Sequence, residues 1–198
     1  MSCLPVFEAN HITPDDQATI ERVFPELGEL RDRQLAHTVR DLWVLFWRQS
    51  SWETLEAVPY LLEAPDLSLI THVRFVAKGC LALGDLCADL LQWSIDRDLL
   101  LAAALLHDAS KPMEYRLTKA GYEKTELGKQ LTHAVYATSL CLQAQLPFDL
   151  VHLVHSHTLM AGVEPQRVEG WILRAVDNAM AEGRLGMSIS RYVAGYNR

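Results

Sequence analysis

Apolar residues recur at intervals of three and four positions along most of the chain, and sustained alternation of apolar and polar residues is nearly absent. The first spacing places apolar side chains on one face of a helix, whereas alternation would indicate strands. We therefore predict an all-α fold, in which helices bury their apolar faces against one another. The sequence has no internal repeat and no low-complexity segment.

Capping residues and prolines set the expected helix boundaries. Thr13 precedes a proline and two acidic residues, so a helix should begin there and end near Val23. Ser68 and Asp96 are expected to cap two further helices, the second ending soon after residue 108 because Pro112 opposes its continuation. Other helices are predicted at 30–49, 51–58, 125–145, 147–156 and 165–182, with a loop or short hairpin at 113–125.

The expected helices divide the chain into three parts. Residues 1–65 are predicted to form an N-terminal helical extension, residues 66–185 a core domain, and residues 186–198 a C-terminal tail. The extension is unusually aromatic, with Trp43, Phe46, Trp47 and Trp52. These rings are expected to pack the extension onto the core, and a homodimer interface is the alternative.

Composition narrows the class of protein. The chain has 198 residues, 49% of them apolar, enough to fill a sizeable interior. Its longest apolar run, eight residues from Leu99 to Leu106, is far shorter than the roughly 20 needed to cross a bilayer. The first ten residues do not resemble a secretory signal, so we expect a cytoplasmic protein without a membrane partner.

Cysteine spacing and net charge argue against three further features: a zinc-thiolate site, a disulfide framework and a surface that binds a nucleic acid duplex. The four cysteines are scattered without a paired motif, which argues against a zinc-thiolate site and a disulfide framework. A net charge of −7 disfavours binding to a nucleic acid duplex, because such binding relies on lysine and arginine neutralising phosphates. A phosphate-bearing ligand would need a local basic patch.

Five segments each place an imidazole or a carboxylate on a predicted buried helix face. Such groups cost several kcal/mol to bury when charged unless they are paired or bind a metal. One histidine of this kind is more often a hydrogen-bonded core residue than a ligand. Five together favour one metal centre, whose nitrogen and oxygen donors suit iron, manganese, nickel or zinc. The candidates are His72, His107 followed by Asp108, His133, His157 and Asp177.

Two assignments around this set stay open. His155 lies two positions before His157, and spacing near a helix end does not decide which ring faces the metal. Lys111 follows Asp108 by three positions and would face the same side if the helix persists. It could hold a substrate phosphate or be an ordinary solvated lysine. The basic residues that follow it, Arg116, Lys119, Lys124 and Lys129, favour an anionic substrate.

These residues resemble the HD-domain superfamily of metal-dependent phosphohydrolases. Its pattern is a histidine, a His-Asp pair and a distant aspartate, here His72, His107 with Asp108, and Asp177. His133 and His157 match two positions found in members with two metals. The layout is similar to that of symmetrical diadenosine tetraphosphatases, whose late arginine would be Arg184 here, or functionally Arg174. Residues 1–65 have no counterpart there, and the Gly-Tyr-Pro signature of cyclic-di-GMP phosphodiesterases is missing.

The resemblance implies an HD-domain helical bundle that hydrolyses a small phosphoester or nucleotide-like substrate by attack of metal-bound hydroxide. It implies one or two divalent metals, iron or manganese first and zinc, nickel or magnesium as alternatives. Asp108 would bridge the metals, and Lys111, with Arg174 or Arg184, would neutralise phosphoryl charge. Two other functions stay open: a di-iron oxygenase that uses the same ligands, and a metal-binding regulatory module without turnover.

Overall fold

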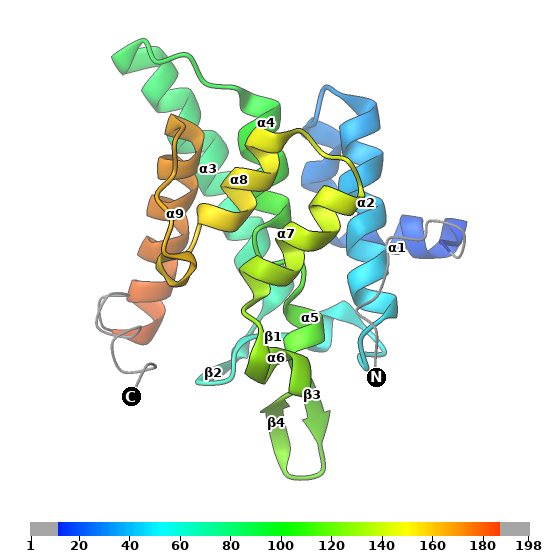
Figure 1. Cartoon of the computed structure of the whole chain (residues 1–198). Helices are drawn as coiled ribbons and strands as arrows, with labels where there is room; N and C mark the ends of the chain where they lie inside the picture. The colour runs from blue at the N-terminus through cyan, green and yellow to red at the C-terminus, as the bar shows by residue number, and fades with distance from the viewer. Residues whose placement is uncertain (1–11, 187–198) are drawn as a thin grey trace.

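The computed structural model describes residues 12–186 (Figure 1). Its helices are α1 (Pro14–Val23), α2 (Arg33–Arg48), α3 (Leu69–Leu91), α4 (Arg97–Leu106), α5 (Lys111–Glu114), α6 (Glu126–Gln130), α7 (His133–Gln143), α8 (Phe148–Ser156) and α9 (Val168–Leu185). Three 3-10 turns, η2 (Pro25–Glu29), η3 (Leu55–Ala57) and η4 (Leu159–Ala161), lie between them. The predicted all-α class is confirmed. The predicted tail, apart from Gly186, lies outside the described residues.

The predicted helix starts rest on side-chain caps. Thr13 accepts a hydrogen bond from the backbone of Asp16, whose carboxylate accepts one from the backbone of Thr13 in return. Ser68 accepts from the backbone N–H of Thr71 at the start of α3. Asp96 caps α4 in the same way. Each cap satisfies a backbone donor that the first helical turn leaves without a partner.

Two antiparallel hairpins depart from a purely helical chain. β3 (Tyr115–Thr118) pairs with β4 (Gly121–Lys124), which confirms the hairpin alternative for residues 113–125. β1 (Pro59–Leu61) pairs with β2 (Ala64–Ser68), a hairpin that the periodicity did not predict. The short helix expected at 51–58 is only the single turn η3. Prolines 59 and 65 lack the backbone N–H that a helix interior requires, so this region turns back on itself.

The helix predicted at 125–145 is broken, because Leu131 and Thr132 adopt extended backbone between α6 and α7. The break follows from tertiary packing. A Cβ at Gly128 would lie 2.5 Å from the carbonyl oxygen of Glu114, so α6 approaches α5 more closely than any other residue would allow. The chain must then change direction to continue as α7, with His133 at its first position.

Helix α4 is the centre of the core, and its residues 99–106 are all buried. Helices α2, α3, α8 and α9 pack around it (Figure 1). The aromatic residues of the predicted extension join the same core: the Trp43 ring is fully buried and its Nε1 donates to the Leu105 carbonyl oxygen at 2.8 Å. These rings therefore pack against the core, as expected.

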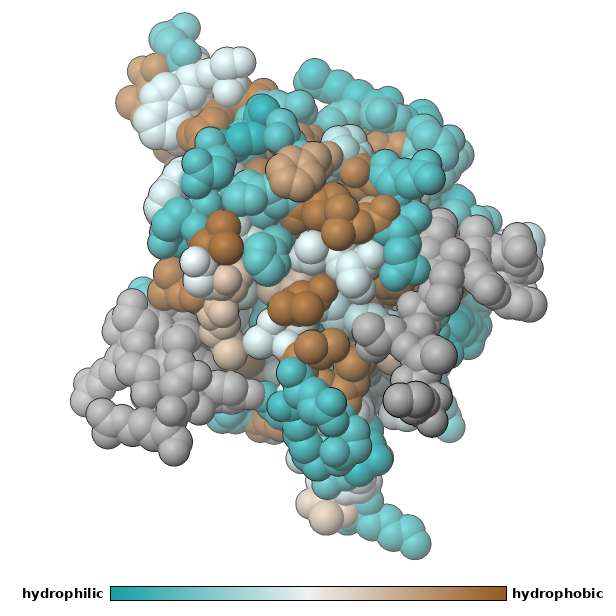
Figure 2. All heavy atoms as spheres, viewed as in Figure 1, coloured by the Kyte–Doolittle hydropathy of each residue, from teal (hydrophilic) through white to brown (hydrophobic). Residues whose placement is uncertain are grey.

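The described part of the chain contains no helix that is both long and apolar enough to cross a membrane. The face seen in Figure 2 mixes polar and apolar side chains. One local group of exposed apolar residues lies at and just after the projecting C-terminal end of α3 (Figure 1). It consists of Leu86, Leu90, Leu91 and Trp93.

Candidate metal centre

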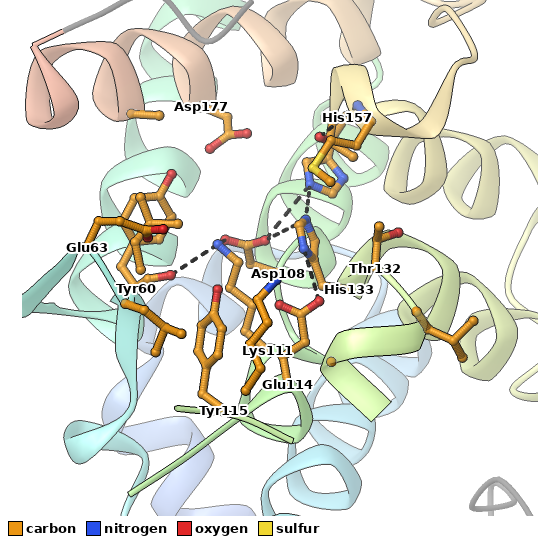
Figure 3. Close-up of a pocket in the computed structure, with 18 of the residues that line it drawn as sticks. Tyr60, Glu63, Asp108, Lys111, Glu114, Tyr115, Thr132, His133, His157 and Asp177 are labelled. Atoms are coloured by element: carbon orange, nitrogen blue, oxygen red, sulfur yellow. Dashed lines mark hydrogen bonds and ion pairs between the residues drawn. The ribbon is translucent and has the colours of Figure 1, made fainter. Parts of the chain in front are cut away.

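The six predicted ligands come from five helices and meet at one place. His72 lies on α3, and His107 and Asp108 follow the end of α4. The other three are His133 at the start of α7, His157 just after α8, and Asp177 on α9. Figure 3 shows Asp108 with Lys111 on one side and the rings of His133 and His157 on the other.

The first group of donors surrounds one oxygen of Asp108. His72 Nε2 lies 3.0 Å from His107 Nε2, 3.1 Å from Asp108 Oδ2 and 3.3 Å from Asp177 Oδ1. His107 Nε2 lies 3.5 Å from the same Asp108 oxygen. Both imidazoles are fully buried. The two imidazole nitrogens and the Asp108 oxygen therefore lie close enough together to hold one ion, and Asp177 Oδ1 borders this group.

The second group surrounds the other oxygen of Asp108. His133 Nε2 lies 3.3 Å from Asp108 Oδ1 and 3.2 Å from His157 Nε2. His157 Nε2 lies 3.9 Å from the same Asp108 oxygen. The two oxygens of one carboxylate thus face different histidine pairs, which is the arrangement of a ligand that bridges two ions.

The separations fit a metal centre. Ligands bound at about 2.1 Å to one ion stand roughly 3.0 to 3.4 Å apart at octahedral or tetrahedral angles. The shortest donor pairs in the two groups, at 3.0 Å and 3.2 Å, fall in this range. The donor chemistry fits as well, since imidazole with carboxylate and no thiolate suits iron, manganese, nickel or zinc.

Hydrogen bonds to the opposite ring nitrogens set the tautomers. His107 Nδ1 lies 2.7 Å from the Ala104 carbonyl oxygen, and His157 Nδ1 lies 2.7 Å from that of Val154. A carbonyl oxygen only accepts, so each Nδ1 must carry the proton and each Nε2 must present a lone pair to the site. His107 and His157 therefore each present an Nε2 lone pair toward the Asp108 carboxylate, and a cation between them would relieve the repulsion.

His133 differs from the other site histidines in its partner. Its Nδ1 lies 3.6 Å from Glu114 Oε1, a carboxylate that is itself buried. His72 instead has the sulfur of Met180 at 3.2 Å from its Nδ1. Carboxylates in this position orient a ligating imidazole and raise its basicity. The sequence reasoning missed Glu114, which lies in the segment expected to be a loop or short hairpin.

The electrostatics keep Asp108, Asp177 and His157 in their metal-binding states. Burial alone would raise the pKa of Asp108, but the charges of Lys111 and the neighbouring histidines hold it well below its usual range. Burial also opposes ionisation of Asp177, yet the hydrogen bond from His72 lowers its pKa to about 2. For His157, burial and two adjacent imidazoles lower the pKa to about 3. At neutral pH both carboxylates are anionic and His157 is neutral. For His133, burial opposes protonation, but the charges of Asp108 and Glu114 raise the pKa.

Lys111 is buried beside the centre, as its spacing suggested. Its Nζ lies 2.8 Å from Asp108 Oδ2 and donates to the Tyr60 carbonyl oxygen at 3.3 Å. It does not lie on a continuation of α4, because α5 starts anew at this residue. Lys111, Lys124 and Lys129 line the pocket that opens over the centre, while Arg116 pairs with Glu123 outside it.

The structure does not bring either predicted arginine to this pocket. The Arg174 guanidinium is buried and donates to the carbonyl oxygens of Ser156 and Val163, besides pairing with Glu164. Arg184 pairs with Asp66 on the surface. Neither arginine lines the pocket. Both guanidinium groups are instead held by these other partners.

Two further expectations concern individual residues. His155 does not line the pocket, and its Nδ1 lies 3.4 Å from the hydroxyl of Thr138. The geometry therefore favours His157 as the ligand. Phe75 lies three residues after His72, a spacing that puts the two on one side of a helix, but 52% of Phe75 is exposed. The buried stripe of α3 is narrower than spacing alone suggested.

The sequence pattern of the HD domain matches residues 69–181, more than half of the chain. The chain belongs to the HD domain family. The matched segment of this HD domain protein begins at α3 and contains all six predicted ligands. No solved structure matches the chain.

One curated relative of this HD domain protein is a dihydroneopterin 2',3'-cyclic phosphate phosphodiesterase from Methanocaldococcus jannaschii. The two sequences are 28% identical over 112 residues, which are 56% of this chain. The match spans 45% of the relative's own length, so the chain covers less than half of it. The family match thus gives the domain, and this relative is a phosphodiesterase by name.

Proposed function

We propose that this HD domain protein is a metal-dependent phosphohydrolase that cleaves a phosphoester or phosphoanhydride bond in a small anionic substrate. The observation that carries the proposal is the position of Asp108. Its two oxygens face separate histidine pairs, and a buried ammonium lies 2.8 Å from one of them. A structural ion pair would need neither the second histidine pair nor an adjoining pocket.

The residues take distinct roles in this proposal. His72, His107, Asp177 and one oxygen of Asp108 would hold one divalent ion, and His133, His157 and the other oxygen would hold a second. Iron or manganese is expected first. Metals held there would lower the pKa of a bound water and polarise a phosphoryl oxygen.

Lys111 would act on the substrate. Its ammonium is fixed beside Asp108 and lines the pocket, so a phosphoryl group that enters the pocket meets a preorganised positive charge. Such a charge stabilises the negative charge that develops on phosphoryl oxygens during the reaction. Lys124 and Lys129 also line the pocket and add to its attraction for anions.

The substrate class is tested with a panel of phosphoesters. The relative's name points to cyclic 2',3'-phosphodiesters, so the panel includes these with linear diesters, monoesters and dinucleoside polyphosphates. Each is assayed with Mn²⁺, Fe²⁺ and Mg²⁺, with and without air. We expect phosphate-bond cleavage that persists without dioxygen. A strict requirement for iron and dioxygen, with an oxidised carbon product, would favour the oxygenase; bound metal without any turnover would favour the regulatory module.

The role of Lys111 has its own test. Lys111→Ala should retain metal but slow turnover, because the lost ammonium acts on the substrate and not on the ions. Lys119→Ala is the matched control, since Lys119 is exposed and does not line the pocket. Equal turnover in the two variants would remove Lys111 from the mechanism.

A further inference from the structure

The β1–β2 hairpin lies before the segment that matches the HD domain, yet it reaches the metal centre. Tyr60, Leu61, Leu62 and Glu63 all line the pocket. The hairpin is tied to the start of α3, because the backbone N–H of Leu69 donates to the carbonyl oxygen of Val58 at 2.8 Å. This segment was predicted to belong to an extension, and it forms one wall of the proposed active site.

Tyr60 contacts two functional side chains at once. Its ring stacks on the His72 imidazole, with centroids 3.7 Å apart and planes 21° from parallel. Lys111 Nζ lies 4.1 Å from the centroid of the same ring and donates to the backbone carbonyl oxygen of Tyr60. Figure 3 shows this hydrogen bond, which crosses from the hairpin to the lysine. Tyr60 is itself buried.

A buried ammonium must be held by its neighbours. Lys111 is 4% exposed, and its contacts are Asp108 Oδ2, the Tyr60 carbonyl oxygen and the Tyr60 ring face. If Asp108 serves as a metal ligand, its charge is shared with the ions and holds Lys111 less strongly. The ring face then gains importance, because a desolvated cation is attracted to an aromatic ring.

We propose that Tyr60 is a positioning residue that keeps the Lys111 ammonium aimed into the pocket to receive a phosphate group. The inference rests on the proposed function. It assigns to the hairpin, outside the family's matched segment, an indirect part in anion binding. Tyr60 does not need to touch the substrate, because it acts through Lys111.

The experiment measures binding of inorganic phosphate to the Mn²⁺-loaded protein by calorimetry. Tyr60→Leu should weaken binding by about tenfold, the size expected when a desolvated cation–π contact is lost. Tyr60→Phe, which keeps the ring and the backbone carbonyl, should recover most of the affinity. Tyr122→Leu is the control, since it removes a half-exposed ring that does not line the pocket.

A double-mutant cycle separates positioning from a general structural effect. In a Lys111→Met background, Tyr60→Leu should cause no further loss of phosphate affinity. An equal loss with and without Lys111 would overturn the proposal, as would loss of bound Mn²⁺ in Tyr60→Leu. Because phosphate binding is measured without turnover, a protein that binds phosphate as expected but cleaves no phosphoester would refute the proposed function alone.

A spectroscopic measurement keeps the proposal testable even if Tyr60→Leu does not fold. In the wild-type protein, the Tyr60 ring current should shift the NMR signals of the Lys111 ε-methylene protons upfield. The Lys111→Met variant assigns these signals by their disappearance. Signals at the positions of a solvated lysine would overturn the proposal.

Discussion

Replacing Glu114 gives the sharpest test of whether the donors form two separate groups around the two oxygens of Asp108. Among the four site histidines, His133 alone has a carboxylate beside its Nδ1, at 3.6 Å. His107 and His157 have backbone carbonyl oxygens there, and His72 has a thioether. Replacing Glu114 should therefore weaken only the group built from His133, His157 and Asp108 Oδ1. The other group should keep its affinity.

The expected size follows from the position of Glu114 behind a ligand. Loss of such a partner typically lowers metal affinity by about 10- to 100-fold. This corresponds to roughly 1.4 to 2.7 kcal/mol of binding free energy. Glu114→Ala should show the full effect. Glu114→Gln keeps the side-chain volume and an amide oxygen that can accept from Nδ1, so its loss should be smaller.

The assay is calorimetric titration of metal-stripped protein with Mn²⁺, which resolves two classes of sites if two ions bind. One class should weaken in Glu114→Ala while the other is unchanged. Glu123→Gln is the control, because Glu123 pairs with Arg116 away from the pocket. Equal weakening of both classes, or of neither, would refute the assignment of Glu114 to His133.

Three further predictions concern the ligands and the core. His107→Ala and Asp108→Ala should each lose metal, measured by elemental analysis, and full occupancy in both would contradict the centre. His157→Ala should lower metal content strongly and His155→Ala should not; equal losses would make both residues ligands. Trp43→Phe leaves a buried carbonyl oxygen on α4 without its donor, so the free energy of unfolding in urea should fall by about 1 to 3 kcal/mol. An unchanged value would mean that the hydrogen bond from Trp43 to Leu105 does not stabilise the fold.

The sequence by itself determined the helical class, the main helix starts and the identity of the ligand candidates. Helix starts depend on local contacts, as at Thr13 and Ser68, where a side chain caps backbone N–H groups a few residues away. The ligand candidates were detectable for a similar reason. An imidazole or carboxylate on an apolar helix face is costly to bury alone. Its presence there therefore predicts a binding partner, even when the sequence does not identify that partner.

Only the tertiary structure decided how these residues combine. The break between α6 and α7 follows from the close approach of Gly128 to Glu114, a contact between separate helices. The Arg174 guanidinium donates to backbone carbonyl oxygens. Every residue has such an oxygen, so the sequence does not indicate which ones an arginine will contact. Helix periodicity did not place Phe75 outside the buried stripe.

The same limit applies to the two positioning residues. Tyr60 contacts His72 and Lys111, and Glu114 contacts His133; in each case the contact joins two different elements. Periodicity reports which face of a helix is buried, but not which side chains of other helices meet it. Contacts between distant segments depend on how the helices pack, and that packing also decided that each oxygen of Asp108 faces a different histidine pair.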